Sequence, residues 1–111
     1  MDEFLWELKD HIVGLNAGRW DYLFSYQKVY RNTKKVILPD RSKVNMFVPF
    51  MSNYNKLLVD TCHKRGAFGM GGMSAQVIAK ANPKEINEKA LAGVKKDKER
   101  ELKQGNDGAW V

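Results

Sequence analysis

Cysteine is nearly absent from this sequence. Cys62 is the single one among 111 residues, so no disulfide can form within the chain. Small secreted domains usually depend on several disulfides, and the lone cysteine therefore favours a reducing compartment. The two histidines, His11 and His63, lie far apart and do not match the ligand spacing of a zinc site.

Long apolar runs are also missing. No stretch approaches the roughly 20 residues that a membrane-spanning helix requires. The first residues, Met1, Asp2 and Glu3, provide neither the basic region nor the apolar region of a secretory signal. We therefore expect no membrane span and see no targeting signal.

What the chain does contain is positive charge on a globular composition. It is 43% hydrophobic and 29% charged, with a net charge of +6, and its length allows one domain at most. Residues 31–65 hold the whole excess, which suggests an anionic partner such as nucleic acid, phosphate or a nucleotide cofactor. The charges of residues 80–103 alternate in sign and are typical of a solvated helix face.

Four helices are predicted. Apolar residues at helical spacing indicate the first at about residues 2–11, and the second follows Gly18 and Arg19. The third starts with Pro49, ends before Gly66, and has an apolar stripe of Phe50, Tyr54, Leu57, Leu58 and Thr61. The fourth covers about residues 83–104, opened by a capping box of Asn82 and Glu85.

Short, uncharged, glycine-rich runs lie between these helices, at residues 12–18, 67–72 and 109–111. They do not alternate polar with apolar residues, a pattern typical of parallel strands buried on both faces. Residues 32–48 are less regular and extended at best. The chain begins inside a helix and stops within a strand, so we expect an internal fragment of a larger α/β domain. A (β/α)8 barrel fits best, although the pattern also allows an open doubly wound sheet.

Several common motifs fail. The run from Gly69 to Ser74 has serine where a dinucleotide fingerprint needs its third glycine, and no P-loop is present. Cys62 and His63 are neighbours on a helix and point about 100° apart, which makes them a poor nucleophile and base pair.

The run from Gly14 to Tyr22 is the most informative. A predicted buried strand ends in glycine, and Asp21 follows at the start of the next helix, where free backbone N–H groups favour an anion. A carboxylate at such a strand end can hold a hard cation. Asp21 can equally be a simple helix cap, and the pattern alone leaves both open.

Residues 11–24, HIVGLNAGRWDYLF, match the signature of the malate synthase family position for position. The resemblance continues through LPDR at 38–41, VPFM at 48–51, TCHKRG at 61–66, GGM at 71–73, DKER at 97–100 and DGAWV at 107–111. It covers essentially the whole chain, with Gly69 and Asn106 standing where alanine and histidine are more usual. The resemblance implies an internal fragment, residues 1–111, of the family's TIM-barrel catalytic domain, truncated at both ends.

The resemblance also implies a reaction. Members are acyltransferases of the glyoxylate bypass, in which a Mg2+-dependent condensation of acetyl-CoA with glyoxylate and thioester hydrolysis give malate and CoA. Asp21 matches the aspartate that ligates the metal, and backbone N–H groups of Gly18, Arg19, Trp20 and Asp21 match those that hold the glyoxylate carboxylate. Met73 and Trp110 match side chains that line the glyoxylate pocket; ordinary core packing is the alternative for both.

The same resemblance places the other catalytic groups outside this segment. The partner glutamate of the metal site and the arginine that stabilises the enolate precede Met1, and the catalytic base follows Val111. We therefore expect no catalytic residue within the segment, and no activity from the segment alone.

The remaining expectations concern partners and location. Small-molecule substrates are expected, with no nucleic acid and no membrane partner, and the oligomeric state is open. A small basic nucleic-acid-binding module is the alternative, based on charge and aromatic content. The expected location is the cytoplasm, or the peroxisome or glyoxysome for a plant or fungal source.

Overall fold

The structure is a computed structural model that describes residues 1–74, 76 and 78–110. Its core is a three-stranded parallel sheet in the order β1 (Gly14–Asn16), β2 (Phe68–Gly71), β3 (Gly108–Ala109). Gly14 pairs with Phe68, and Met70 pairs with Gly108. The expected parallel α/β arrangement is therefore confirmed, with β1 and β2 shorter than the sequence predicted. Val111, the last residue of the third predicted strand, lies outside the described residues.

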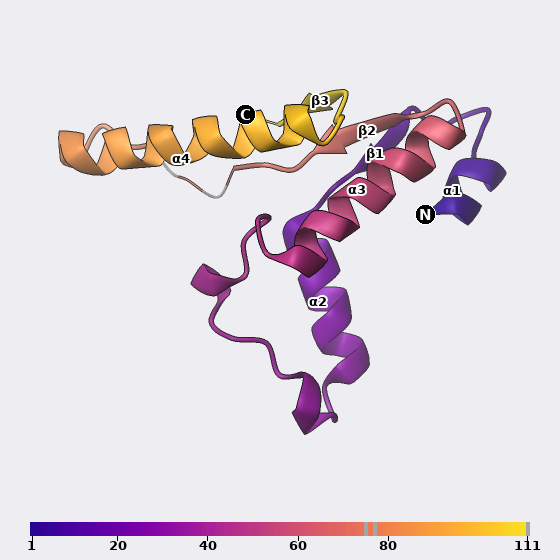
Figure 1. Ribbon diagram of the computed structural model, residues 1–111, viewed down its shortest axis with the longest axis horizontal. Coiled ribbons are helices and arrows are strands. Elements are labelled where there is room, and N and C mark those ends of the chain that lie inside the picture. The colour runs from indigo at the N-terminus through magenta and orange to yellow at the C-terminus, as the bar shows by residue number, and fades with distance from the viewer. Residues whose placement is uncertain (75, 77, 111) are drawn as a thin grey trace.

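Four α-helices connect and flank the strands (Figure 1). They are α1 (Asp2–Glu7), α2 (Arg19–Tyr30), α3 (Pro49–Lys64) and α4 (Lys84–Lys103). Two 3-10 turns, η1 (Lys34–Val36) and η2 (Arg41–Lys43), interrupt the irregular segment between α2 and α3. Helix α3 packs on β1 and β2, α4 packs on β3, and α1 packs on α3.

The helix boundaries follow local chemistry. Pro49 stands at the first helical position of α3. Gly66 lies just after the helix and stops it from continuing, with a φ of 72° that few residues other than glycine adopt. Helix α1 is shorter than predicted, because the amides of His11 and Ile12 both donate to the carbonyl of Leu8 and close the helix there. The capping-box prediction is wrong in register, since α4 begins at Lys84 with Pro83 as its N-cap.

Only one face of β2 is well covered. A side chain at Gly69 would contact Leu58 and Val59 of α3, so this face lies under the helix layer. Phe68, on the opposite face, is 54% exposed. The prediction of strands buried on both faces is thus met on one face only within these residues.

The apolar stripe predicted for α3 is displaced by one residue. The buried positions are Met51, Asn55, Leu58, Val59 and Cys62, while Leu57 is 59% exposed. A shift of one residue rotates the buried face by about 100°. The cause is Asn55, a polar residue that is fully buried because it has buried hydrogen-bond partners, which hydrophobicity alone does not reveal.

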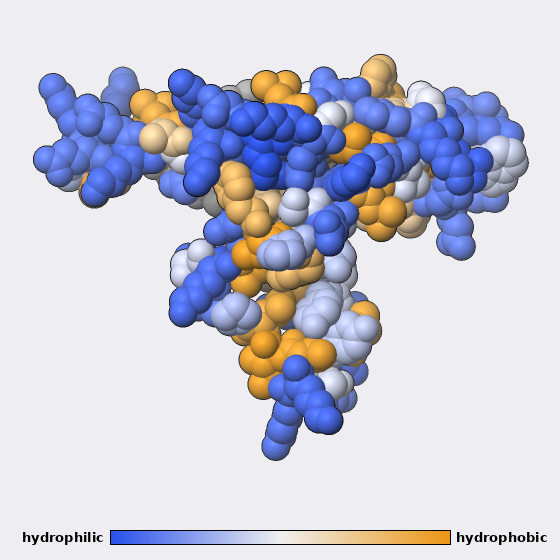
Figure 2. All heavy atoms as spheres, viewed as in Figure 1, coloured by the Kyte–Doolittle hydropathy of each residue, from blue (hydrophilic) through white to orange (hydrophobic). Residues whose placement is uncertain are grey.

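The molecule is extended and leaves much apolar surface open. Its radius of gyration is 15.8 Å, against about 13 Å for a compact domain of this length. Figure 2 shows apolar surface on the projection formed by α2 and the segment that follows it. Phe24, Val29 and Ile37 are among the exposed residues there. Across the described part of the chain, no helix is long and apolar enough to cross a membrane.

Candidate functional site

The carboxyl ends of the three strands meet at one edge of the sheet, because the strands are parallel. Two hydrogen bonds join the first two ends: the Asn16 side-chain amide donates to the Gly71 carbonyl at 2.9 Å, and the Ala17 amide donates to the Met70 carbonyl at 2.8 Å. In parallel α/β sheets this edge is where ligands bind. The residues that follow each strand therefore form the candidate site.

Helix α2 begins at this edge. Gly18 is its N-cap, with extended backbone angles and no side chain to cap the first-turn amides. Those N–H groups have no partner within the helix, and the positive end of the helix dipole lies beside them. The start of α2 can therefore receive an anion such as a carboxylate.

The carboxylate of Asp21 lies in the first turn of α2, directly against Gly18. A Cβ at position 18 would collide with that carboxylate in its present position, so a larger residue there would require the Asp21 side chain to move. Asp21 is exposed, and the structure gives it no hydrogen bond or ion pair with any residue that it describes. Its negative charge adds to the effect of burial in raising the pKa of the Tyr54 hydroxyl. This carboxylate is therefore available to a ligand.

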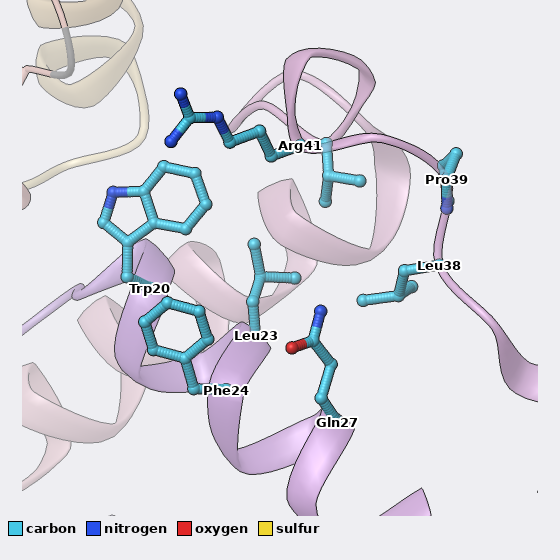
Figure 3. A pocket seen from close by; sticks show the side chains of 8 residues that line it. Trp20, Leu23, Phe24, Gln27, Leu38, Pro39 and Arg41 are labelled. Atoms are coloured by element: carbon cyan, nitrogen blue, oxygen red, sulfur yellow. The ribbon is translucent and has the colours of Figure 1, made fainter. Parts of the chain in front are cut away.

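The side chains of Arg19 and Trp20 stack on each other, with the guanidinium 4.3 Å from the indole centroid. Burial lowers the pKa of the Arg19 guanidinium, and the Asp97 carboxylate opposes this change. Trp20 also stacks on Phe24 and lines a cavity of about 450 Å³ between α2 and residues 38–44 (Figure 3). Both side chains are engaged in packing, so Arg19 and Trp20 have only their backbone amides available to an anion at the start of α2.

Met73 and Trp110 follow the ends of β2 and β3. Met73 is 73% exposed and Trp110 is 58% exposed, so neither packs into the core of these residues. The structure places both at the same edge as Gly18 and Asp21. Their contact with a substrate stays a prediction.

A buried polar network behind this edge escaped the sequence analysis. Arg100 and Glu101 of α4 are 8% and 3% exposed, which makes the prediction of a solvated face wrong at these positions. Arg100 contacts Asp97 at 3.1 Å and Gln104 at 2.6 Å, and Glu101 contacts Lys98 at 3.1 Å. The spacings of three and four residues between these partners are the signal that could have indicated a linked set.

Cys62 and His63 do not form a reactive pair. Cys62 is fully buried, and burial raises the pKa of its thiol. The His63 ring points elsewhere, with its Nε2 atom 2.8 Å from the Asp107 carboxylate. Both residues have structural positions, as the sequence predicted.

All 111 residues match the family described as malate synthase, TIM barrel domain. The chain belongs to the malate synthase family. It is 53% identical over its whole length to malate synthase from Dictyostelium discoideum and to malate synthase A from Escherichia coli K12, covering 20% of each. It is 52% identical to a glyoxysomal malate synthase from Gossypium hirsutum, covering 19% of that protein. The chain thus spans about one fifth of the length of the relatives it matches.

Membership of the malate synthase family confirms the expected fold class. Three parallel strands with intervening helices are what a segment of a TIM barrel contains. The catalytic edge in such barrels is the carboxyl edge, where Gly18, Asp21, Met73 and Trp110 lie. The open doubly wound sheet, which the strand pattern also allowed, is thereby set aside.

The malate synthase resemblance implies magnesium, and the residues at this edge fit one part of such a site. Mg2+ is usually held by one or two carboxylates together with water and substrate oxygens. Asp21 offers one exposed carboxylate, which has no partner within the part of the chain that the structure describes. Among the described residues no group of three His, Cys, Asp or Glu side chains comes together.

Proposed function

We propose that the full-length protein, meaning the polypeptide encoded by the complete reading frame around these residues, is a malate synthase. It condenses acetyl-CoA with glyoxylate, hydrolyses the thioester, and releases malate and CoA. The observation that carries the proposal is the start of α2, where uncapped amides lie beside the Asp21 carboxylate at the carboxyl edge of the sheet, and this carboxylate has no partner among the described residues.

Under this proposal the amides at the start of α2 hold the carboxylate group of glyoxylate. Arg19, Trp20 and Asp21 contribute through their backbone N–H groups. The Gly18 amide, which was also predicted to contribute, already donates to the Asn16 carbonyl at 2.9 Å, so Gly18 contributes by having no side chain to occupy the position. The helix dipole adds a favourable electrostatic interaction of about 0.3–1 kcal/mol at an exposed helix end. This arrangement orients the aldehyde carbon relative to Asp21.

Asp21 is proposed to be a magnesium ligand. When bound, the metal polarises the aldehyde of glyoxylate as a Lewis acid. Met73 and Trp110 are proposed to wall the pocket and to keep water out, which strengthens electrostatic interactions inside it. No catalytic base or enolate-stabilising residue is assigned to this segment.

We also propose that residues 1–111 are one part of a longer catalytic barrel. Eight strands close a TIM barrel, and this segment contributes three. The exposed face of β2 and the exposed apolar side chains of α2 support this proposal, since further strands and helices would cover them. The expected location is the cytoplasm, or the glyoxysome in a plant, as in the name of the Gossypium hirsutum relative. The nucleic-acid-binding alternative rests on net charge and on aromatic and arginine content alone.

The test compares Asp21→Asn with the wild type in the full-length protein. We expect turnover to fall at least about 100-fold and the magnesium midpoint to rise, because a charged hard ligand becomes a neutral one of equal size. The thermal midpoint should change little, since Asp21 has no hydrogen-bond or ion-pair partner among the residues that the structure describes. The measurement is thiol release from acetyl-CoA plus glyoxylate over a magnesium titration.

Asp10→Asn is the matched control, because Asp10 is also exposed and lies before β1 at the other end of the strand. This variant should retain wild-type rates. A full-length wild type that releases no thiol with glyoxylate and Mg2+ refutes the proposed activity. An Asp21→Asn variant with wild-type turnover and an unchanged magnesium midpoint refutes the role of Asp21 as a metal ligand.

A further inference from the structure

Three consecutive carbonyl groups at the end of β2 each accept a hydrogen bond from a different residue. The Met70 carbonyl accepts from the Ala17 amide, and the Gly71 carbonyl accepts from the Asn16 side chain. The third, on Gly72, accepts from the Lys98 ammonium at 2.7 Å. Two of the three donors belong to the β1 end, and the third belongs to α4. The end of β2 is thus fixed from both sides.

Lys98 is itself held by Glu101. Its ammonium donates to the Glu101 carboxylate at 3.1 Å, and Arg100 approaches the other carboxylate oxygen at 3.4 Å. Burial raises the pKa of the Glu101 carboxyl, and its hydrogen bond with Lys98 opposes the rise. The Glu101 carboxylate lies directly against Gly71, where a Cβ would collide with it. Lys98 therefore holds Gly72 through a hydrogen bond, and Glu101 packs directly against Gly71.

The backbone held by Lys98 and Glu101 is also in contact with the residue before the start of α2. A Cβ at Gly72 would lie 2.8 Å from the Ala17 carbonyl oxygen, so the two backbones are in close contact. Ala17 is buried and immediately precedes Gly18. Because protein interiors are close-packed, a displacement of Gly72 is passed on to Ala17 and to the amides that follow it.

We propose that Lys98 and Glu101 are positioning residues that set the place of the Gly18–Asp21 turn and of Met73 for substrate binding. The proposal rests on the function proposed above. An ion pair that only stabilised the fold would need no contact with the Gly72 carbonyl, which lies between the last residue of β2 and Met73.

The test uses Lys98→Met in the full-length protein, with Lys95→Met as the matched control. Lys95 lies on the same helix with a side chain that is 79% exposed. We expect the glyoxylate KM of Lys98→Met to rise about tenfold, since a small misplacement of binding groups is costly. The acetyl-CoA KM should change less than about twofold, because the α2 start is proposed to hold glyoxylate. Lys98→Arg keeps a cation that can reach the same acceptors and should restore most of the glyoxylate affinity.

A second measurement does not depend on activity. Amide hydrogen exchange in peptides covering residues 16–19 and 72–74 should be faster in Lys98→Met than in Lys95→Met. If Lys98→Met does not fold, Glu101→Gln takes its place, because it keeps the size of the side chain and removes its charge.

The outcomes separate the two proposals. A wild type without malate formation refutes the proposed function, and the exchange measurement then decides the positioning role alone. If the wild type is active, an unchanged glyoxylate KM with unchanged exchange overturns the positioning role. A parallel rise of both KM values together with a fall in thermal midpoint also overturns it, in favour of a purely structural ion pair.

Discussion

The aspartates at the two ends of the sheet differ in their hydrogen-bond partners. At the amino end, the Asp107 carboxylate accepts from the Gly69 amide and lies 2.8 Å from His63, while Asn106 donates to the Gly69 carbonyl. At the carboxyl end, the Asp21 carboxylate has no such partner among the described residues, and Trp110 is exposed.

This difference separates the residues that stabilise the fold from those that are free to bind a ligand. Paired groups at the amino end join β2 to β3. The buried one, Asn106, contributes to stability through its hydrogen bonds, since a buried polar group without a partner costs free energy. Unpaired groups at the carboxyl end contribute little to stability and remain available to ligands. In TIM barrels the same division holds between the stabilising face and the catalytic face. Substitutions at the two ends should therefore give different combinations of lost stability and lost activity.

The largest effect on stability is expected at Asn55. Its side chain donates to Asn106 at 2.8 Å and to Gln104 at 2.7 Å, so Asn55→Ala leaves buried partners unsatisfied. We expect the free energy of unfolding of the full-length protein to fall by about 2–3 kcal/mol. Denaturant unfolding measures this fall, and kcat per folded molecule should be unchanged.

The control for this change is Asn53→Ala, on the exposed face of the same helix, with an expected effect within about 0.5 kcal/mol. Equal destabilisation by the two variants would mean that the network around Asn55 contributes nothing specific.

A smaller effect, on substrate binding, is expected at Trp110. Trp110→Ala should raise the glyoxylate KM about fivefold to tenfold and lower turnover, because an aromatic wall shapes the pocket and excludes water. Steady-state kinetics and a thermal melt test this together. Trp6→Ala, a 52% exposed tryptophan at the amino end, should leave both kinetic constants unchanged.

The alternative role for Trp110 is packing that stabilises the full-length protein. A loss of about 3–5 kcal/mol, as for a buried tryptophan, with unchanged kinetics would assign this side chain to packing in the full-length protein.

The smallest expected effect is a loss of stability at acid pH, through the Asp107 carboxyl. The Gly69 amide and then His63 lower the pKa of the Asp107 carboxyl. A lowered pKa stabilises the folded state above the ordinary aspartate value of about 3.9, and this contribution is lost as the pH falls through the lowered pKa. Wild type should exceed Asp107→Asn in stability by about 1 kcal/mol at pH 6, with the gap closing below about pH 4.

Urea unfolding at a series of pH values measures this gap, and Asp10→Asn controls for the loss of one carboxylate. A gap that stays constant down to pH 2 would show that the charge of Asp107 is not what stabilises the amino end.

The sequence was sufficient for features set by local chemistry. Pro49 and Gly66 mark the ends of the α3 region because each restricts or frees the backbone at its own position. The glycine-rich runs indicate the strands because they follow helix ends, carry no charge and do not alternate polar with apolar residues. Asp21 could be selected because it follows a strand that ends in glycine.

The burial of polar residues could not be predicted from the sequence, because it depends on tertiary partners. Asn55 is buried because Gln104 and Asn106, about 50 residues away, meet its amide. Glu101 is buried because Lys98 and Arg100 offset its charge. Composition assigns such residues to the surface, and only the fold brings their partners together.

The close contact between Gly71 and Glu101 makes these two positions interdependent in mutation. Gly71→Ala alone should be poorly tolerated, since its methyl group would overlap the buried carboxylate. A shorter side chain at position 101, as in Glu101→Ser, would make room for that methyl group while giving up the partner of Lys98. The two substitutions should therefore be non-additive, with the double variant less impaired than the separate effects predict. An engineer who varies either position should vary both in one library.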